Sequence, residues 1–287
     1  MLDKIVPKKI KNLCDLIRLD KPIGFLLLMW PCWLALANLP QDNAELTYWY
    51  VYFVIGAFLM RSAGCIINDF VDINLDKNVE RTAERPLTSK KVSITEAIVL
   101  LLVLLFFSFY ILLKFNFFAI LTGLASIPLV LLYPFLKRYT YWPQLGLGLV
   151  FSWGVLIVSI QFTGTISLSF LLLYIACVFW TLAYDTIYAY QDREDDIKNN
   201  VKSTAVLFGS NGRKYVRVFY SIFYIIIGFL GFYSSKSFLS LVVIIALIFV
   251  MNLHLNKWKL DSTKSSNHYF KFNNIIGLLC FLYLVIF

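Results

Sequence analysis

The sequence predicts an all-α membrane protein in which nine transmembrane helices form one bundle around a central cavity. Composition is the first reason, because 60% of the 287 residues are hydrophobic and 17% are aromatic, far above the usual content of a soluble globular domain. The second reason is that the apolar runs reach the roughly 20 residues that cross a ~30 Å hydrocarbon layer as a helix. The third is that basic residues gather in alternate loops, as successive spans require.

The apolar runs divide the chain into nine expected spans. They lie at about residues 22–39, 47–67, 93–113, 115–135, 143–162, 165–187, 215–234, 237–255 and 269–287. Two long polar loops, at about 68–92 and 188–214, follow the second and the sixth span. Because no soluble second domain is evident, we expect a single integral-membrane domain over residues 1–287.

The basic residues indicate how these spans are oriented. The formal net charge is +9, but nearly all Lys and Arg of the loops fall on the side of the N-terminus, and the opposite loops contain only Lys114 and Lys236. The positive-inside rule then places the N-terminus and both long loops in the cytoplasm. The stretch before Pro22 lacks the apolar core of a signal peptide, which favours a bacterial inner (cytoplasmic) membrane. The charge therefore indicates membrane orientation, and we expect no nucleic-acid partner.

Two acid-rich segments each follow directly on an apolar run. In the first, residues 68–76, three carboxylates fall within roughly 60° of arc on a helix, those of Asp69, Asp72 and Asp76. In the second, residues 185–196, three share roughly 40° of arc, those of Asp185, Asp192 and Asp196. Each segment ends the second helix of a four-helix run, about 120 residues apart, which predicts two pseudo-repeats of four helices plus one. Packed as one bundle, the two carboxylate stripes would face each other across the cavity.

Carboxylates crowded in a low-dielectric place repel one another, and divalent cations are their natural compensation. Mg²⁺ takes hard oxygen ligands and commonly binds through one or two carboxylates together with substrate phosphates. The two stripes therefore predict a site for Mg²⁺ and a diphosphate. The candidate diphosphate-binding residues are the nearby cations Arg61, Arg81, Arg85, Lys137, Arg138, Lys198 and Lys202. Arg61 lies inside an apolar span, where an ionisable residue normally faces the bundle interior.

Each of these patterns also has a purely structural interpretation. Acidic residues at the end of a membrane helix are often solvated loop residues, and Arg85-Pro86 also fits a helix-ending turn. Lys137 and Arg138 also suit the role of positively charged membrane anchors. Most aromatic residues face lipid or core. The aromatic side chains close enough to the acid segments to line a substrate cavity are Phe70, Tyr184 and Tyr188.

The spacing of the two acid motifs is specific. The motifs read Asn68-Asp69-x-x-Asp72-x-x-x-Asp76 and Asp192-x-x-Asp195-Asp196. Other characteristic runs are Arg18-Leu19-Asp20-Lys21-Pro22-Ile23-Gly24, Met60-Arg61-Ser62-Ala63-Gly64-Cys65, Arg85-Pro86-Leu87, Tyr133-Pro134-Phe135-x-Lys137-Arg138-Tyr139-Thr140, Tyr184-Asp185-Thr186-x-Tyr188-Ala189 and Lys202-Ser203-Thr204-Ala205. With these runs the chain resembles, nearly end to end, the UbiA superfamily of intramembrane prenyltransferases, and within it the branch that acts on 4-hydroxybenzoate.

The resemblance implies an enzyme that transfers a polyprenyl group from polyprenyl diphosphate to the ring carbon ortho to the hydroxyl of 4-hydroxybenzoate, in ubiquinone biosynthesis. It implies Mg²⁺ as cofactor and an apolar groove that opens to membrane lipid. The metal ligands would come from Asn68, Asp69, Asp72, Asp76, Asp185, Asp192, Asp195 and Asp196. Catalytic roles would fall to Asp72 as a metal ligand, to Asp192 as a proton acceptor, and to Arg138, which would hold either the acceptor carboxylate or the diphosphate.

Two positions depart from the usual pattern of the family. Lys90 stands where the family has Gly after Arg-Pro-Leu-x-Ser, and Asn200 replaces a common Gly before Lys202. Asn tolerates a positive φ well, whereas Lys does so less readily. The resemblance therefore leaves the loop conformation at Lys90 open but removes no expected metal ligand.

Other functions make different demands on the same segments. A related prenyltransferase with another aromatic or haem acceptor needs the same acid motifs and differs in the acceptor alone. A divalent-cation transporter predicts carboxylates spread through several spans to the far side, whereas both stripes here crowd one face. A non-catalytic membrane scaffold has no need of matched stripes.

Overall fold

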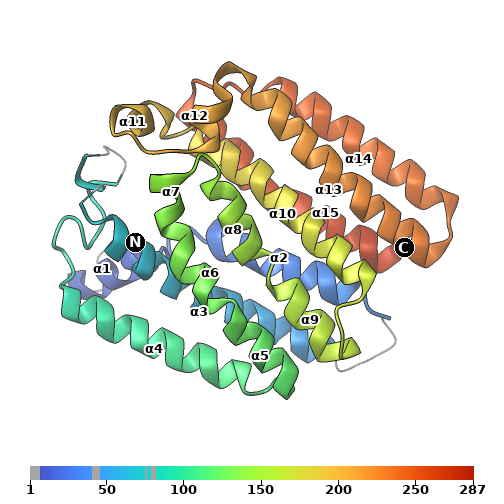
Figure 1. Cartoon of the computed structure of the whole chain (residues 1–287), viewed down its shortest axis with the longest axis horizontal. Helices are drawn as coiled ribbons and strands as arrows, with labels where there is room; N and C mark the ends of the chain where they lie inside the picture. The colour runs from blue at the N-terminus through green and yellow to red at the C-terminus, as the bar shows by residue number, and fades with distance from the viewer. Residues whose placement is uncertain (1–6, 41–45, 75, 79–81) are drawn as a thin grey trace.

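A computed structural model describes residues 7–40, 46–74, 76–78 and 82–287 of the chain. This part is built from α-helices and short 3₁₀ turns, without a strand (Figure 1). In chain order the elements are α1 (Lys8–Leu16), α2 (Ile23–Ala37), α3 (Leu46–Asp72), η2 (Asp76–Asn78), α4 (Ile94–Leu112), α5 (Phe117–Ala125), α6 (Ile127–Leu132), η3 (Tyr133–Phe135), α7 (Leu136–Tyr139), α8 (Pro143–Phe151), α9 (Gly154–Thr163), α10 (Leu168–Ala189), α11 (Arg193–Lys198), α12 (Thr204–Phe208), η4 (Gly209–Asn211), α13 (Gly212–Ser235), α14 (Phe238–Asn256) and α15 (Thr263–Ile286).

The all-helical membrane fold predicted from the sequence is confirmed. Among the described residues, eight helical stretches are long and apolar enough to cross a membrane. Three of them combine shorter helices, namely Phe117–Tyr139, Pro143–Thr163 and Thr204–Ser235. The remaining expected span, the first in the chain at about 22–39, corresponds to α2, which has only 15 residues and therefore a length of about 22 Å. The number of spans stays a prediction, because α2 is shorter than the hydrocarbon layer.

Local sequence explains where several helices begin and end. Ser93 caps α4, since its hydroxyl accepts from the Glu96 amide while the Glu96 carboxylate accepts from the Ser93 amide. Pro128 lacks an amide hydrogen, and the fourth span is interrupted just before it, between α5 and α6. Gly164 ends α9 with a left-handed φ of 72°, a conformation that glycine adopts without steric cost.

Helix α10 lies at the centre of the bundle. It packs against α8, α13 and α15. Of the 18 residues in its apolar stretch, 67% are buried inside the protein, compared with 11% for the stretch in α4. The outer side chains of α4 are large and apolar, including Phe106 at 66% exposed and Tyr110 at 55% exposed. Such a surface suits lipid contact. The helix that leads into the second acid segment is thus the most enclosed of the eight stretches.

A buried amide joins three helices at the centre. Asn273 of α15 is fully buried, and its carbonyl oxygen accepts from the Trp180 indole of α10 and the Tyr220 hydroxyl of α13, both at 2.8 Å. Close packing continues along α15, because a Cβ on Gly277 would lie only 2.6 Å from ring atoms of Trp30 in α2. These contacts hold α2, α10 and α13 against the C-terminal helix.

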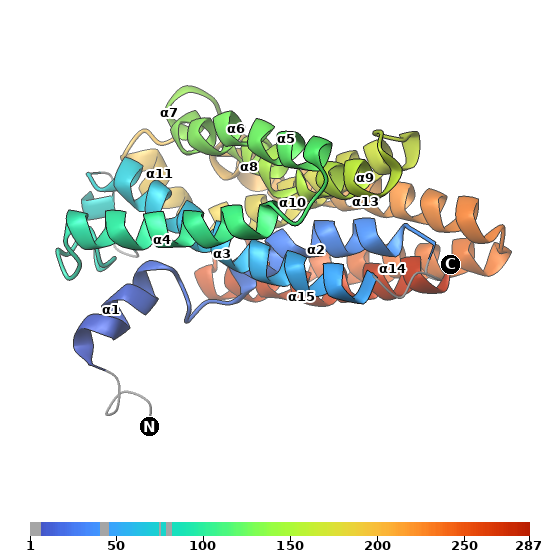
Figure 2. The ribbon, with the colours of Figure 1, turned by 90° about the horizontal axis from the view of Figure 1, so that it is seen from below.

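The two acid segments emerge at the same end of the bundle. Helix α3 packs against α2 and α4, and α10 packs against α8 and α13, so each acid-bearing helix is flanked by its own neighbours in sequence. The ends of α3 and α10 lie with α1, α11 and α12 at one end of the long axis, and the C-terminus lies at the other (Figures 1 and 2). The arrangement agrees with the predicted pseudo-repeat, which itself stays a prediction.

Candidate active site

One cavity of about 750 Å³ is lined by both acid segments. The ends of α3 and α10, the loop before α2, the segment after η2 and the start of α15 form its walls. The two acid segments contribute six carboxylates to its lining, from Asp69, Asp72, Asp76, Asp185, Asp192 and Asp196. Segments more than a hundred residues apart in the sequence therefore present their acids to one chamber.

The first acid segment is compensated by cations of the chain itself. One guanidinium nitrogen of Arg18, Nη2, donates to both oxygens of Asp69 at 2.7 and 2.8 Å. Arg85 Nη1 donates to Asp69 Oδ1 at 3.2 Å and to Asp76 Oδ2 at 2.7 Å. The Asp69 side chain is 1% exposed, so these charge-assisted hydrogen bonds form largely out of water.

Lys137 links the two halves of the site. Its ammonium forms an ion pair and a hydrogen bond with Asp72 Oδ2, at the end of α3. Its backbone carbonyl accepts from the Lys202 amide at 2.9 Å, in the loop that follows the second acid segment. Lys202 in turn donates its ammonium to the Tyr139 carbonyl at 3.0 Å. The α7 turn is thereby fixed between both acid segments.

The second acid segment begins inside α10 and continues through α11. Asp185 is half-buried near the end of α10, and Asp192 occupies the N-cap position of α11. The Asp196 amide donates to the Asp192 carbonyl at 2.8 Å, and the Asp196 carbonyl accepts from the Val201 amide at 2.8 Å. These backbone hydrogen bonds hold the turn that carries both side chains at the cavity wall.

Arg61 is the cation set deepest in a span. It lies in α3, lines the cavity, and places its guanidinium 5.7 Å from the centre of the Phe151 ring. Its Nε is buried without a hydrogen-bond partner in the described structure. A Cβ on Gly24 would lie 2.7 Å from this nitrogen, so glycine leaves the space that the guanidinium uses. A buried, unpartnered donor suits an anionic ligand.

The carboxylate oxygens that line the cavity are suitable ligands for Mg²⁺. Asp72 Oδ1 is buried and has no hydrogen-bond partner in the described structure, and a ligand can satisfy it. No three His, Cys, Asp or Glu side chains among the described residues are grouped closely enough to hold a metal by themselves. Mg²⁺ needs only one or two carboxylates when water and phosphate oxygens complete its shell. The residues present therefore suit a metal that arrives with a phosphate-bearing ligand.

Several predicted residues lie away from the cavity lining. Arg138 is exposed and donates to the Val71 carbonyl at 2.9 Å, next to Asp72. Asp195 and Lys198 face each other at 3.8 Å, on α11. Phe70 packs in a separate cluster with α4 residues. Arg81 lies outside the described residues.

The aromatic lining comes partly from a helix that the sequence did not implicate. Tyr184 and Tyr188 line the cavity, as predicted. The ring centres of Tyr188 and of Phe270 in α15 are 4.7 Å apart. Phe270 and Lys271 also line it. No sequence motif marks these two residues. Arg18 was present in a matching run, but nothing in its spacing pointed to Asp69.

Both family departures adopt the backbone conformation that glycine favours. Lys90 has φ 58° and Asn200 has φ 54°. The loop at Lys90 thus keeps a left-handed residue despite a side chain that disfavours it. Near that loop Lys91 pairs with Glu84 at 2.6 Å, and this ion pair lowers the pKa of the Glu84 carboxyl.

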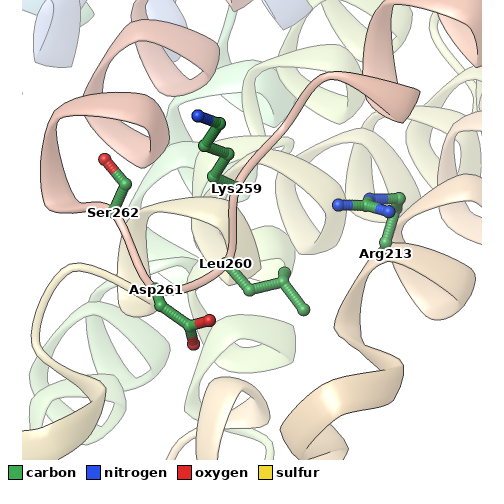
Figure 3. A pocket seen from close by; sticks show the side chains of 5 residues that line it. All are labelled: Arg213, Lys259, Leu260, Asp261 and Ser262. Atoms are coloured by element: carbon green, nitrogen blue, oxygen red, sulfur yellow. The ribbon is translucent and has the colours of Figure 1, made fainter.

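A second hollow, of about 460 Å³, lies between the start of α13 and the α14–α15 turn. Figure 3 shows the residues that line it, Arg213, Lys259, Leu260, Asp261 and Ser262. Arg213 is occupied by a hydrogen bond to the Trp258 carbonyl. Among its described lining residues it presents one carboxylate, so it lacks the opposed acids of the larger cavity.

Comparison with known proteins shows what this chain resembles. A model of the UbiA prenyltransferase family matches residues 28–275. A 4-hydroxybenzoate octaprenyltransferase of Blochmanniella pennsylvanica is 40% identical, covering 96% of this chain and 95% of that protein. Another, of Vibrio parahaemolyticus, is 42% identical and covers 86% of this chain and 88% of that protein. A solved UbiA homolog from Archaeoglobus fulgidus, bound to GPP and Mg²⁺, shares the fold with a TM-score of 0.69 at 18% identity, covering 96% of this chain and 100% of that one.

Proposed function

Because this chain belongs to the UbiA prenyltransferase family, we propose that it transfers a polyprenyl group from polyprenyl diphosphate to 4-hydroxybenzoate and releases diphosphate. The new bond forms at the ring carbon ortho to the hydroxyl, and the product enters ubiquinone biosynthesis. The observation that carries the proposal is the single cavity lined by both acid segments and by cations of the chain. Relatives that share 40–42% of their residues bear the name of this activity.

The acid segments bind and activate the donor. Asp72, Asp76, Asp192 and Asp196 would hold Mg²⁺, with Asn68, Asp69 and Asp185 near them at the same cavity. When bound, the metal neutralises diphosphate oxygens and so favours departure of the leaving group. Arg61, Arg85, Lys137 and Lys202 line the cavity and would bind the same oxygens. The C–O bond to the diphosphate then breaks and leaves an allylic cation.

The acceptor ring attacks that cation, forming a C–C bond, and then loses a proton from the attacked carbon. Asp192 is the carboxylate that we assign to accept it. Ring faces of Tyr184 and Tyr188 can stabilise the cation from the cavity wall. Arg138 holds the Val71 carbonyl instead of facing the cavity, so we assign it to positioning Asp72. Asp195 and Lys198 would act indirectly, because the ion pair between them stabilises α11, which carries Asp196.

The chain would work as one domain in the bacterial inner membrane, with its N-terminus and site facing the cytoplasm. Support comes from the charge distribution in the sequence, and the ends of α3 and α10, which line the cavity, lie at the same end of the bundle as α1, α11 and α12 (Figure 1). The end with the C-terminus carries the turns that contain Lys114 and Lys236. Polyprenyl diphosphate would enter from membrane lipid, and 4-hydroxybenzoate from the aqueous side.

The test is incorporation of labelled 4-hydroxybenzoate into lipid-soluble product by membranes that contain this protein. Wild type should need Mg²⁺ and should lose activity in EDTA. Asp72→Asn and Asp192→Asn should each lower the rate by about 100-fold or more, because each removes charge from the site of ionisation. The matched control is Asp261→Asn, an exposed carboxylate in the separate hollow. Product formation that is indifferent to EDTA, or to both substitutions, would refute the proposal.

A further inference from the structure

Every carboxylate of the first acid segment faces a cation of the chain. Arg18 and Arg85 hold Asp69, Arg85 holds Asp76, and Lys137 holds Asp72. The three carboxylates and three cations cancel in formal charge. The Asp side chains are only 1%, 8% and 2% exposed for Asp69, Asp76 and Asp72, so the pairs lie largely out of solvent.

This neutrality makes binding of a divalent cation alone unfavourable. Each carboxylate of the first segment is already paired, so a metal that arrives alone adds positive charge beside these cations and must displace one of them to reach a carboxylate oxygen. A diphosphate alone would place its negative charge against the same carboxylates. Arriving together, each ligand supplies the charge that the other lacks. The metal would take carboxylate oxygens, and the cations that held these oxygens would be free to bind the diphosphate.

The three cations differ in their freedom to turn. Arg85 is held by two carboxylates, since its Nη1 donates to Asp69 at 3.2 Å and to Asp76 at 2.7 Å. Arg18 is held on two sides, since Nη2 binds both Asp69 oxygens and Nη1 donates to the Asp15 carbonyl at 3.1 Å. Lys137 is a point charge on a flexible stem, 25% exposed at the cavity wall. Its backbone is fixed through the Lys202 amide, so rotation of the side chain alone moves the charge. Lys137 is therefore the cation best built to change partner.

We propose that Lys137 exchanges partners during donor binding, from Asp72 to the diphosphate, and thereby couples the binding of the metal to that of the diphosphate. The inference rests on the proposed function and adds a binding order to it. Lys137 competes with the metal for Asp72 until a diphosphate draws the ammonium away. By linkage, each ligand raises the affinity of the other by the same factor.

The first arm of the test measures metal affinity without any diphosphate. Mn²⁺ serves as the probe, and the electron paramagnetic resonance signal of free Mn²⁺ is followed while full-length protein in detergent is titrated. Lys137→Gln removes the competitor, so it should bind Mn²⁺ at least about tenfold more tightly than wild type, the scale of one close charge pair. Lys137→Arg keeps the charge and should bind no more tightly than wild type.

The matched control is Lys9→Gln, which removes one charge from an exposed ion pair with Glu96 outside the cavity. It should leave Mn²⁺ affinity unchanged. Size-exclusion profiles and thermal midpoints establish that each variant is folded. If Lys137→Gln does not fold, the Arg variant carries the test, and a tenfold gain in its Mn²⁺ affinity would overturn the exchange.

The second arm measures binding of a polyprenyl thiolodiphosphate, an unreactive donor analogue, at saturating Mg²⁺. Lys137→Gln should bind it at least about tenfold more weakly than wild type, because the diphosphate loses one cation. Opposite changes in the two arms are the signature of exchange. A structural role would weaken both affinities, and that result would overturn it. Failure of wild type to bind the analogue at all would instead refute the proposed function.

Discussion

The pair between Arg18 and Asp69 should stabilise the fold as well as the site. Arg18→Ala removes both hydrogen bonds to Asp69 and leaves a fully buried carboxylate with Arg85 alone, at 3.2 Å. Breaking a buried ion pair from one side costs about 3–5 kcal/mol, because the remaining charge is uncompensated. Backbone strain does not change, since alanine keeps the Cβ at the φ of 59° that Arg18 adopts.

A double-mutant cycle separates this interaction from loss of packing. Asp69→Asn removes the buried charge, so Arg18→Ala should cost much less in that background. We expect a coupling free energy of about 2–3 kcal/mol. The assay is reversible unfolding by sodium dodecyl sulfate in mixed micelles, followed by circular dichroism, for wild type, both single variants and the double variant.

Additive effects in this cycle, within about 0.5 kcal/mol, would refute the assignment of Arg18 as the counter-ion of Asp69. The control cycle uses Lys9→Ala and Glu96→Ala, whose ion pair lies on the surface with the Lys9 side chain 74% exposed. Exposed pairs are screened by solvent, so no coupling should be measurable there. Coupling of equal size in both cycles would mean that the measurement does not report burial.

Three further substitutions test the fold with the same unfolding assay. Lys90→Gly should stabilise by up to about 1 kcal/mol, because it relieves a positive φ, and a loss of stability would contradict the left-handed turn. Gly277→Leu should cost about 1–3 kcal/mol or more, since its Cβ meets the Trp30 ring; an unchanged midpoint would contradict that contact. Asn273→Leu should cost about 2–5 kcal/mol, because the Trp180 indole loses its acceptor, and an altered near-ultraviolet spectrum should accompany it.

The positions of the spans were predictable because lipid imposes one rule on every span. Backbone polar groups must be satisfied within the segment, so each long apolar run becomes a helix. The interruptions were not predicted, although Pro128 marks one of them. The expected span at about 22–39 corresponds to α2, which is helical over Ile23–Ala37. A hydropathy profile shows where apolar residues are concentrated, but it does not show where the helical hydrogen bonding within a span is interrupted.

The acids of the site were easier to predict than their partners. Helical spacing alone placed Asp69 and Asp72 on one face of α3, and both line the cavity. Pairing is different, because Arg18 meets Asp69 across 51 residues and only the folded chain brings them together. Phe270 and Lys271 belong to a helix whose sequence shows no motif, so tertiary packing alone places them at the cavity.

The link between the two halves explains why the acid segments share one chamber. Residues 136–142 connect η3 to α8, and among them Lys137 lines the cavity whereas Tyr139 is 76% exposed. Lys137 binds Asp72 with its side chain and the second half with its carbonyl, while Lys202 returns a hydrogen bond to the Tyr139 carbonyl. A displacement of either half would therefore strain the same turn. The turn between η3 and α8 thus also helps to fix the distance between the two acid segments.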